Sequence, residues 1–157
     1  MRWIFVSLLL ISCHVFGQWK EFLLTSNGDT INCVDQQGRK QGPWLNSYAT
    51  MRGEPGYEEE GVYFNGKKEG EWRLYSLMGD PIGVEFYRWG FKDSICRYYS
   101  MNGNLRIEQG WLAMNPAKQY DTFRIQDLDD LDTYRTMIVK NEGTSIRHGN
   151  WKYYDPV

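Results

Sequence analysis

The sequence predicts an all-β fold built from tandem antiparallel β-hairpins of about 24 residues each, with a short helical insertion. Three observations carry this prediction. Aromatic residues make up 16% of the chain and 16 glycines punctuate it. Long aliphatic runs are few, and glycines and aromatic residues recur at a fixed offset. These features favour short strands joined by tight turns, in units that bury a core only when they are stacked.

The chain begins with the layout of a secretory signal peptide, residues 1–17. Arg2 precedes an apolar run at residues 4–11, and Val15 and Gly17 suit a cut after Gly17. The run is shorter than the roughly 20 apolar residues that a membrane-spanning helix needs. Cys13 offers an alternative, a lipoprotein signal whose cysteine receives a lipid anchor. We therefore expect an exported chain, periplasmic or at the cell surface or extracellular, with anchoring through Cys13 as the alternative.

Residues 18–157 have the length of a single domain. Without Arg2, the chain keeps 17 of its 18 Lys and Arg, against 20 Asp and Glu. The two signs are mixed along the sequence, so no basic stripe favours nucleic acid.

Removal of the signal peptide would leave Cys33 and Cys96 as the remaining cysteines. An exported chain can keep disulfides, and an even count fits one bridge. Two separate buried thiols fit the sequence equally well, because pairing cannot be deduced from spacing. Both alternatives stay open from the sequence.

The main signal is a repeat with an offset of 24 residues. Partial copies flank it at residues 38–48 and 149–154, so four units are visible, enough for a stacked array. The matching pairs are Tyr63 and Tyr87, Gly66 and Gly90, Tyr75 and Tyr99, and Gly79 and Gly103.

Within a unit the pattern is that of a hairpin. Residues 71–75 alternate, which places Trp72 and Leu74 on one side of a strand and Arg73 and Tyr75 on the other. The other expected elements are a turn at residues 77–80, a second strand at 84–87, and hairpin turns at Asn65-Gly66 and Trp89-Gly90.

The central unit reads Tyr63-x-Asn65-Gly66-Lys67-Lys68-x-Gly70-x-Trp72-x-x-Tyr75. This motif resembles the MORN-type repeat family, and most of all its YwqK-like, antitoxin-like variant. The resemblance covers residues 35–111 well and 143–155 partly, as a last partial repeat. It implies hairpins side by side in an elongated curved sheet that makes protein or membrane contacts, without family-wide catalytic residues. Ser94 and Cys96 replace the glycine and tryptophan of the third unit, which leaves its turn geometry open.

Residues 112–142 interrupt the array. Ile125, Leu128 and Leu131 are spaced by three among acidic residues, which predicts a short helical insertion near residues 120–132. Residues 133–139 then alternate as a returning strand.

A basic residue stands two positions before a tyrosine in three units. Stacked in an array, these side chains would form a row suited to carboxylate, phosphate or glycan ligands, or to a partner strand. Ordinary cross-strand pairing on a half-solvated face is the alternative, and the opposite, tryptophan-rich face is expected to form the core. The members of this Arg–Tyr row are Arg73, Tyr75, Arg97, Tyr99, Lys152 and Tyr154.

The sequence predicts no catalytic residue, cofactor or metal. His148 is the one histidine after the signal peptide, and no nucleophile or phosphate-loop motif is present. The acidic stretch at residues 127–132 lacks the glycine and glutamate of a calcium loop and is expected to be a solvated turn. Paired glutamates in a cleft would support a hydrolase as a weak alternative; the candidates are Glu59, Glu85 and Glu108.

The expected function is therefore non-catalytic: protein–protein interaction or scaffolding in the cell envelope. Binding of a glycan or envelope polymer by the Arg–Tyr row is the alternative. An antitoxin-like partner role, implied by the resemblance alone, is weaker because a signal peptide fits a cytosolic antitoxin badly.

Overall fold

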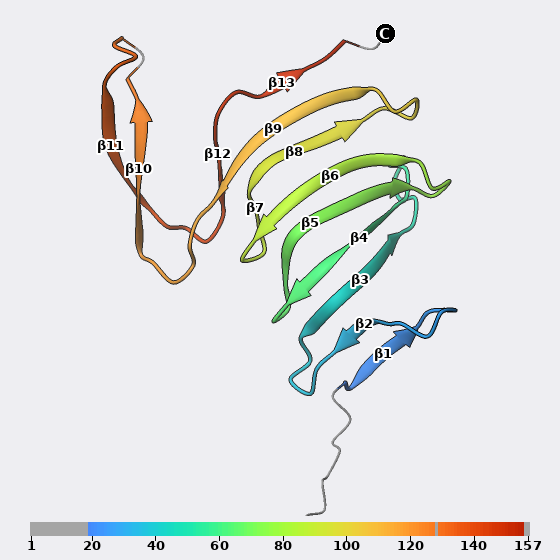
Figure 1. Ribbon diagram of the computed structural model, residues 1–157. Coiled ribbons are helices and arrows are strands. Elements are labelled where there is room, and N and C mark those ends of the chain that lie inside the picture. Colours follow the sequence, from blue (N-terminus) through green and yellow to red (C-terminus); the bar gives the residue numbers. More distant parts are fainter. Residues whose placement is uncertain (1–18, 128, 156–157) are drawn as a thin grey trace, which may run out of the picture.

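The computed structural model describes residues 19–127 and 129–155, and in these residues the chain forms β-strands and no helix. Eleven strands make one main sheet and two make a separate hairpin (Figure 1). The all-β prediction and the prediction of consecutive antiparallel hairpins are confirmed.

The strands follow one another at short intervals along the chain. The separate hairpin consists of β10 (Tyr120–Gln126) and β11 (Tyr134–Lys140). The strands of the main sheet are β1 (Glu21–Leu24), β2 (Thr30–Val34), β3 (Lys40–Tyr48), β4 (Tyr57–Phe64), β5 (Lys67–Ser76), β6 (Pro81–Arg88), β7 (Phe91–Lys92), β8 (Ser94–Tyr99), β9 (Leu105–Ala113), β12 (Ser145–Arg147) and β13 (Lys152–Tyr153).

Neighbours in the sequence are neighbours in the sheet. The order is β1-β2-β3-β4-β5-β6-β8-β9-β12, with β7 paired to β6 and β13 paired to β9. All the pairs are antiparallel, and the last two strands return to cover the free edge of β9. Each hairpin therefore shares a strand interface with the next, as stacked repeats require.

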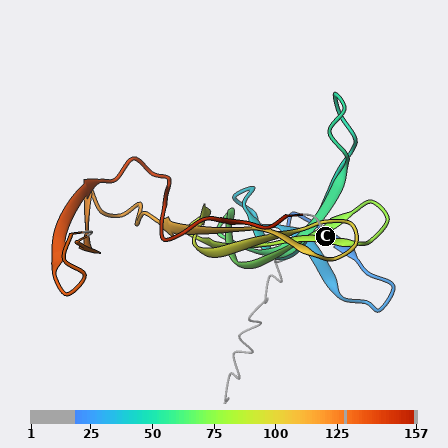
Figure 2. The ribbon, with the colours of Figure 1, turned by 90° about the horizontal axis from the view of Figure 1, so that it is seen from above.

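Seen from above, the main sheet is a single layer (Figure 2). Its core face carries Trp72, Glu59 and Cys96, which are buried. Its outer face carries Val62 and Phe64, which are 45% and 64% exposed. The alternation predicted for residues 71–75 is confirmed, because Arg73 and Tyr75 both reach Glu60 of the outer face.

A close approach between β4 and β5 anchors the core face. The indole of Trp72 lies on Gly61, where an added Cβ would stand 2.3 Å from Trp72 Cδ2. The register of β4 and β5 shifts between Glu60 and Val62, so Gly61 lies opposite a bulge in β5. Only glycine leaves room there for a fully buried tryptophan.

The hairpin turns also join one repeat to the previous one. Asn65 and Gly66 have φ values of 51° and 76°, as both central residues of a type I′ turn require. The backbone N–H of Asn65 donates to Gln41 Oε1 at 2.9 Å, and that of Gly66 donates to the Lys40 carbonyl at 2.9 Å.

The next turn repeats this arrangement with a bulkier residue. Trp89 and Gly90 have φ values of 56° and 87°. The Trp89 N–H donates to Glu69 Oε2 at 2.9 Å and the Gly90 N–H to the Lys68 carbonyl at 3.0 Å. The contacts between repeats thus fix a left-handed backbone that a tryptophan rarely adopts.

The third unit keeps the positive φ of the other units at the position where serine replaces their glycine. Ser94 has a φ of 59°, close to the 70° of Gly42 and of Gly70. Serine therefore stands at this position of the third unit in a left-handed backbone, at the cost of strain in one residue.

Ser94→Gly is expected to raise the free energy of unfolding by about 0.5 to 1 kcal/mol, because glycine adopts this φ without a steric cost. The reverse exchange, Gly70→Ser, should lower it by a similar amount. Urea unfolding followed by circular dichroism measures both. A Ser94→Gly protein that is less stable than the natural one would contradict the strain assigned to this position.

The first hairpin leaves the plane of the sheet at Asn32. Cys33 and Val34 of β2 pair with β3, while Asn32 adopts a φ of 53° and turns β2 away. Its side-chain amide then makes the two hydrogen bonds to Leu45 that a paired strand would make. The amide oxygen accepts from the Leu45 backbone N–H at 2.8 Å, and the amide nitrogen donates to the Leu45 carbonyl at 2.9 Å.

The predicted helical insertion near residues 120–132 is wrong. Residues 120–126 form β10, which pairs in unbroken register with β11 from Tyr120↔Lys140 to Gln126↔Tyr134. The spacing of Ile125 and Leu131 is not a helical face, because Ile125 belongs to a strand of β-branched and aromatic residues and Leu131 to the turn after it. The returning strand predicted at residues 133–139 is confirmed as β11.

Candidate functional site

The structure places most of the Arg–Tyr row on one line across the sheet. Successive pairings run from Arg73 to Val84, from Val84 to Arg97, from Arg97 to Glu108, and from Glu108 to Lys152. These strands therefore bring the three basic residues of the row to the same face at the same height.

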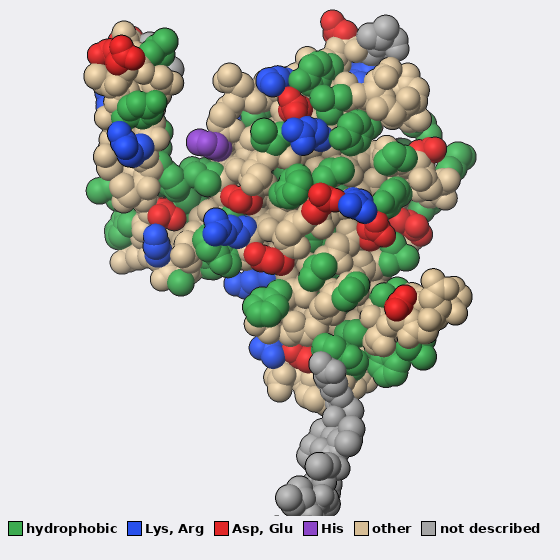
Figure 3. Space-filling model, viewed as in Figure 1, with side chains coloured by type: hydrophobic (Ala, Val, Ile, Leu, Met, Phe, Trp, Pro, Cys, Tyr) green, Lys and Arg blue, Asp and Glu red, His purple; other side chains and the backbone are tan. Residues whose placement is uncertain are grey.

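Carboxylates of the same line neutralise the row. Arg97 Nε lies 2.9 Å from Glu108 Oε2, and Lys152 Nζ lies 3.1 Å from Glu108 Oε1. Arg73 contacts Glu71 at 2.7 Å and Glu60 at 3.9 Å. The cations thus form in-sheet ion pairs, and Figure 3 shows Lys and Arg interspersed with Asp and Glu over the main sheet on the face displayed.

The tyrosines of the row follow two patterns. The Tyr75 hydroxyl donates to Glu60 at 2.9 Å and the Tyr154 hydroxyl donates to Glu108 at 3.0 Å. Tyr99 is half-buried at the end of β8, opposite Leu105. Ligand binding by the row remains a prediction, on a surface whose polar groups already pair with one another.

The core face carries a second row that the sequence reasoning missed. Three lysine ammonium groups lie over aromatic rings: Lys40 over Trp44 and Tyr63, Lys68 over Trp72 and Tyr87, and Lys92 over Tyr98 and Trp111. We call these three residues the lysine ladder. The signal was present in the sequence, because each lysine stands two positions after a turn glycine, at Gly38, Gly66 and Gly90.

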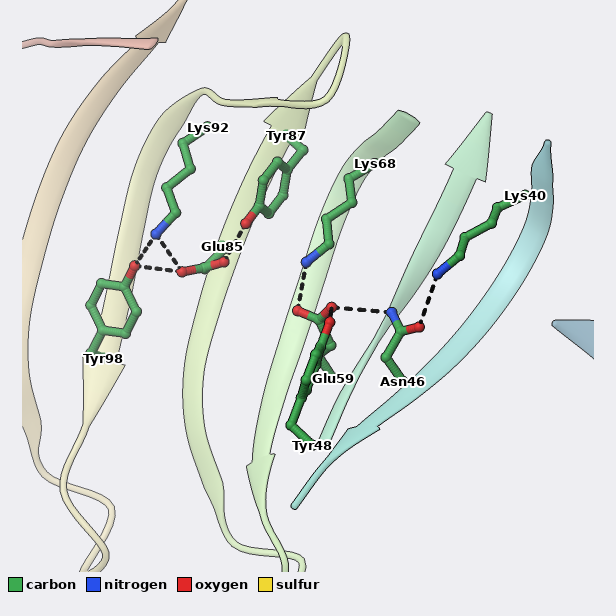
Figure 4. A network of polar contacts seen from close by, with 9 residues as sticks. All are labelled: Lys40, Asn46, Tyr48, Glu59, Lys68, Glu85, Tyr87, Lys92 and Tyr98. Atoms are coloured by element: carbon green, nitrogen blue, oxygen red, sulfur yellow. Dashed lines mark hydrogen bonds and ion pairs between the residues drawn. The ribbon is translucent and has the colours of Figure 1, made fainter. Parts of the chain in front are cut away.

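Two members of the lysine ladder bind buried carboxylates (Figure 4). Lys68 Nζ lies 2.5 Å from Glu59 Oε2, and the Tyr48 hydroxyl and the Asn46 amide donate to Glu59 Oε1 at 2.9 and 3.1 Å. Glu59 is 2% exposed, so its charge is compensated inside the fold by these partners.

Glu85 forms the second cluster, with the same chemistry. Lys92 Nζ lies 2.6 Å from Glu85 Oε1, and the hydroxyls of Tyr87 and Tyr98 each donate to this carboxylate at 2.6 Å. Burial alone would raise the pKa of Glu85, but the hydrogen bonds from Lys92, Tyr87 and Tyr98 outweigh it and lower the pKa. Burial and the hydrogen bonds to Glu85 raise the pKa of both tyrosines.

These contacts place the three glutamates that were candidates for a catalytic acid and base. Glu59 and Glu85 lie on the core face, each bound to its own lysine. Glu108 lies on the outer face, because it pairs across β8 with Arg97. The sheet therefore separates Glu108 from the other two.

The cysteines considered for a disulfide are free and buried. Cys33 lies on β2 and Cys96 on β8, with four strands between them. Five strand spacings amount to roughly 24 Å, whereas a disulfide needs Cα atoms within about 7 Å. The bridge is not formed, and the alternative of two separate buried thiols describes this chain.

The acidic stretch is the turn between β10 and β11. Asp127 pairs with Arg135, and the carboxylates of Asp127 and Asp130 accept backbone N–H groups of the turn. Across residues 19–127 and 129–155, no group of three or more His, Cys, Asp and Glu side chains is arranged to hold a metal ion. His148 lies beside β9, where its backbone N–H donates to the Gly110 carbonyl.

The β10–β11 hairpin stands apart from the main sheet in both views (Figures 1 and 2). Neither of its strands pairs with a strand of the main sheet. Phe123 and Met137 are direct cross-strand partners on one face, while Ile138 lies on the other. Met137 is 40% exposed and Ile138 is 69% exposed, so both faces present apolar surface.

The predicted signal peptide and the alternative lipid site at Cys13 lie outside the described residues. Within the part of the chain that the structure covers, no helix is long and apolar enough to cross a membrane. No family model, curated protein or solved structure matches the chain.

Proposed function

We propose that this chain is a non-catalytic protein-binding or scaffolding module of the cell envelope, and that the β10–β11 hairpin is its main contact element. One observation carries the proposal. The hairpin projects from the sheet with apolar side chains exposed on both faces. An isolated two-stranded hairpin is marginally stable in water, so a partner that covers it would supply the burial it lacks.

The backbone of the hairpin supports the same proposal. Among the strands of residues 19–127 and 129–155, β10 and β11 pair only with each other, so the outer edge of each strand is open to another chain. An extended partner segment can add to such an edge through main-chain hydrogen bonds, with side-chain pockets giving specificity. The envelope location rests on the predicted signal peptide, with the Cys13 anchor as its alternative.

The glycan alternative receives less support. An anionic polymer would have to displace Glu108 from Arg97 and Lys152, which it holds at 2.9 and 3.1 Å. Charges that are already paired contribute little to a new ligand.

The test is affinity capture from an envelope extract with residues 18–157 as bait. A Phe123→Lys, Met137→Lys variant places two charges on one face of the hairpin. A Leu77→Lys, Met78→Lys variant adds the same charge at the β5–β6 turn, where both residues are also exposed. An Arg73→Glu, Arg97→Glu, Lys152→Glu variant reverses the row, and circular dichroism checks the folding of all three.

A protein captured by the natural bait and the turn variant, and lost by the hairpin variant, is the expected result. Loss by the row variant alone would move the contact to the outer face of the main sheet. Capture of no protein by the natural bait would reject the protein-binding proposal and make a glycan array the next measurement.

A further inference from the structure

The lysine ladder is incomplete at its first member. Lys40 Nζ lies 4.2 Å from the ring centroid of Trp44 and 4.8 Å from that of Tyr63. The corresponding distances for Lys68 are 4.3 Å to Trp72 and 4.9 Å to Tyr87. The two ammonium groups therefore lie at nearly the same distances from their aromatic rings.

Their polar partners differ. Lys68 and Lys92 meet buried carboxylates at 2.5 and 2.6 Å. Lys40 meets only the amide oxygen of Asn46, at 3.4 Å, and among the described residues no carboxylate lies within 4 Å of its ammonium. An ammonium group has three N–H donors, so at least two remain for another acceptor.

The divergence of β2 from β3 accounts for this difference. Glu59 and Glu85 reach Lys68 and Lys92 from the strand that precedes each lysine in the sheet. For Lys40 the preceding strand is β2, which carries no acidic residue and turns away at Asn32. At this end of the ladder the fold therefore supplies the lysine and its two aromatic rings but no carboxylate.

A hollow adjoins this position. It has a volume of about 580 Å³, and its lining residues are Lys20, Glu21, Phe22, Leu23, Asn32, Val34 and Trp44. Trp44 carries Lys40 over its ring, and Val34 is the cross-strand partner of Lys40. Lys20 and Glu21 of the lining lie 4.0 Å apart and offset each other, so Lys40, next to the hollow, is the cation there without a carboxylate partner.

We propose that Lys40 and this hollow form a binding site for a carboxylate carried on an aromatic or apolar body. The carboxylate would complete the ladder by binding the Lys40 ammonium, and the body would lie against Trp44 and Val34. Asn46 is a positioning residue, because its amide donates to Glu59 and thereby turns its oxygen toward Lys40. This site is separate from the hairpin and names a ligand chemistry for the same binding module.

The experiment is a titration of residues 18–157 with N-acetylphenylalanine, followed by the nuclear magnetic resonance signal of the Trp44 indole N–H. This group donates to the Gln41 and Cys33 carbonyls at 3.1 and 3.3 Å and reports on the site directly. N-acetylphenylalaninamide has the same body without the charge. A peptide with a C-terminal phenylalanine carboxylate tests whether the acid comes from a chain end or from a free small molecule.

The acid is expected to bind about tenfold more tightly than its amide, because only the acid forms a charge-assisted hydrogen bond. Lys40→Met should weaken binding of the acid about tenfold, whereas Lys67→Met, at an exposed lysine of β5 that does not line the hollow, should change it less than twofold. Tighter binding of the peptide would assign the site to protein termini, and tighter binding of the free acid would assign it to small molecules.

Equal binding of acid and amide, or unchanged binding by Lys40→Met, would overturn the proposal. The comparison of acid with amide needs no variant, so it decides the question even where Lys40→Met does not fold. The hairpin variant leaves Lys40 untouched, so failure of protein capture and failure of this titration are separate results.

Discussion

Replacing Trp72 with alanine is expected to lower the free energy of unfolding by about 3 to 5 kcal/mol. The side chain is fully buried, rests on Gly61 and meets the rings of Tyr63 and Tyr87 edge-on, at centroid distances of 5.0 and 6.3 Å. Because the sheet is a single layer, no second layer can move in to fill the space. Urea unfolding followed by circular dichroism measures the change.

Phe64→Ala is the matched control for this prediction. Phe64 is an aromatic residue at the end of β4 and is 64% exposed on the outer face. Its removal should cost less than about 1 kcal/mol, since exposed apolar side chains bury little area. Similar losses for the two variants would show that Trp72 does not anchor the core face.

Lys92→Met is expected to destabilise the fold by about 2 to 4 kcal/mol. The substitution leaves the carboxylate of Glu85, 8% exposed, without its cation, and removal of one partner from a buried ion pair strands the other charge. We place the loss below the usual range for a fully buried pair, because the Lys92 side chain is 30% exposed.

Two further variants isolate the ion pair. Lys67→Met removes an exposed lysine at the start of β5 and should change stability by less than about 0.5 kcal/mol. Adding Glu85→Gln to Lys92→Met removes the stranded charge and should recover part of the loss. A Lys92→Met protein as stable as the Lys67→Met protein would contradict the assignment.

The pH dependence of stability is an independent test of this ion pair. In the natural chain the pKa of Glu85 is lowered, so its contribution to stability is present above the unfolded value of about 4.3 and is lost as the pH falls through the folded value. In Lys92→Met, burial is opposed by fewer hydrogen bonds, and protonation relieves the stranded charge. The difference in stability between the two proteins should therefore shrink between pH 7 and pH 4.

The hairpins were predictable because their signals are local. Asn65-Gly66 and the glycine at position 79 specify turns through their own φ angles, and the alternation around Trp72 assigns each side chain to a face. The misassigned insertion shows the limit of such reasoning. A spacing of three between apolar residues cannot reveal that Ile125 and Leu131 belong to different elements, whereas the pairing of β10 with β11 does.

The Arg–Tyr row shows the same limit at a surface. Its spacing correctly placed Arg73 and Arg97 on one face, but the sequence did not reveal that Glu60 and Glu108 stand beside them. These contacts join residues 11 to 13 positions apart whose meeting depends on the pairing of neighbouring strands. A row that looks cationic in the sequence is therefore nearly balanced in the sheet.

The sequence by itself determined the all-β class, the repeat, the hairpin turns and the alternation of faces around Trp72, because φ preference and the two-residue period of a strand are properties of a short segment. Only the tertiary structure decided that Lys68 and Lys92 would meet buried carboxylates and that Lys40 would not. That difference arises from register and from the turn of β2 at Asn32, and both depend on contacts between strands that no single segment encodes.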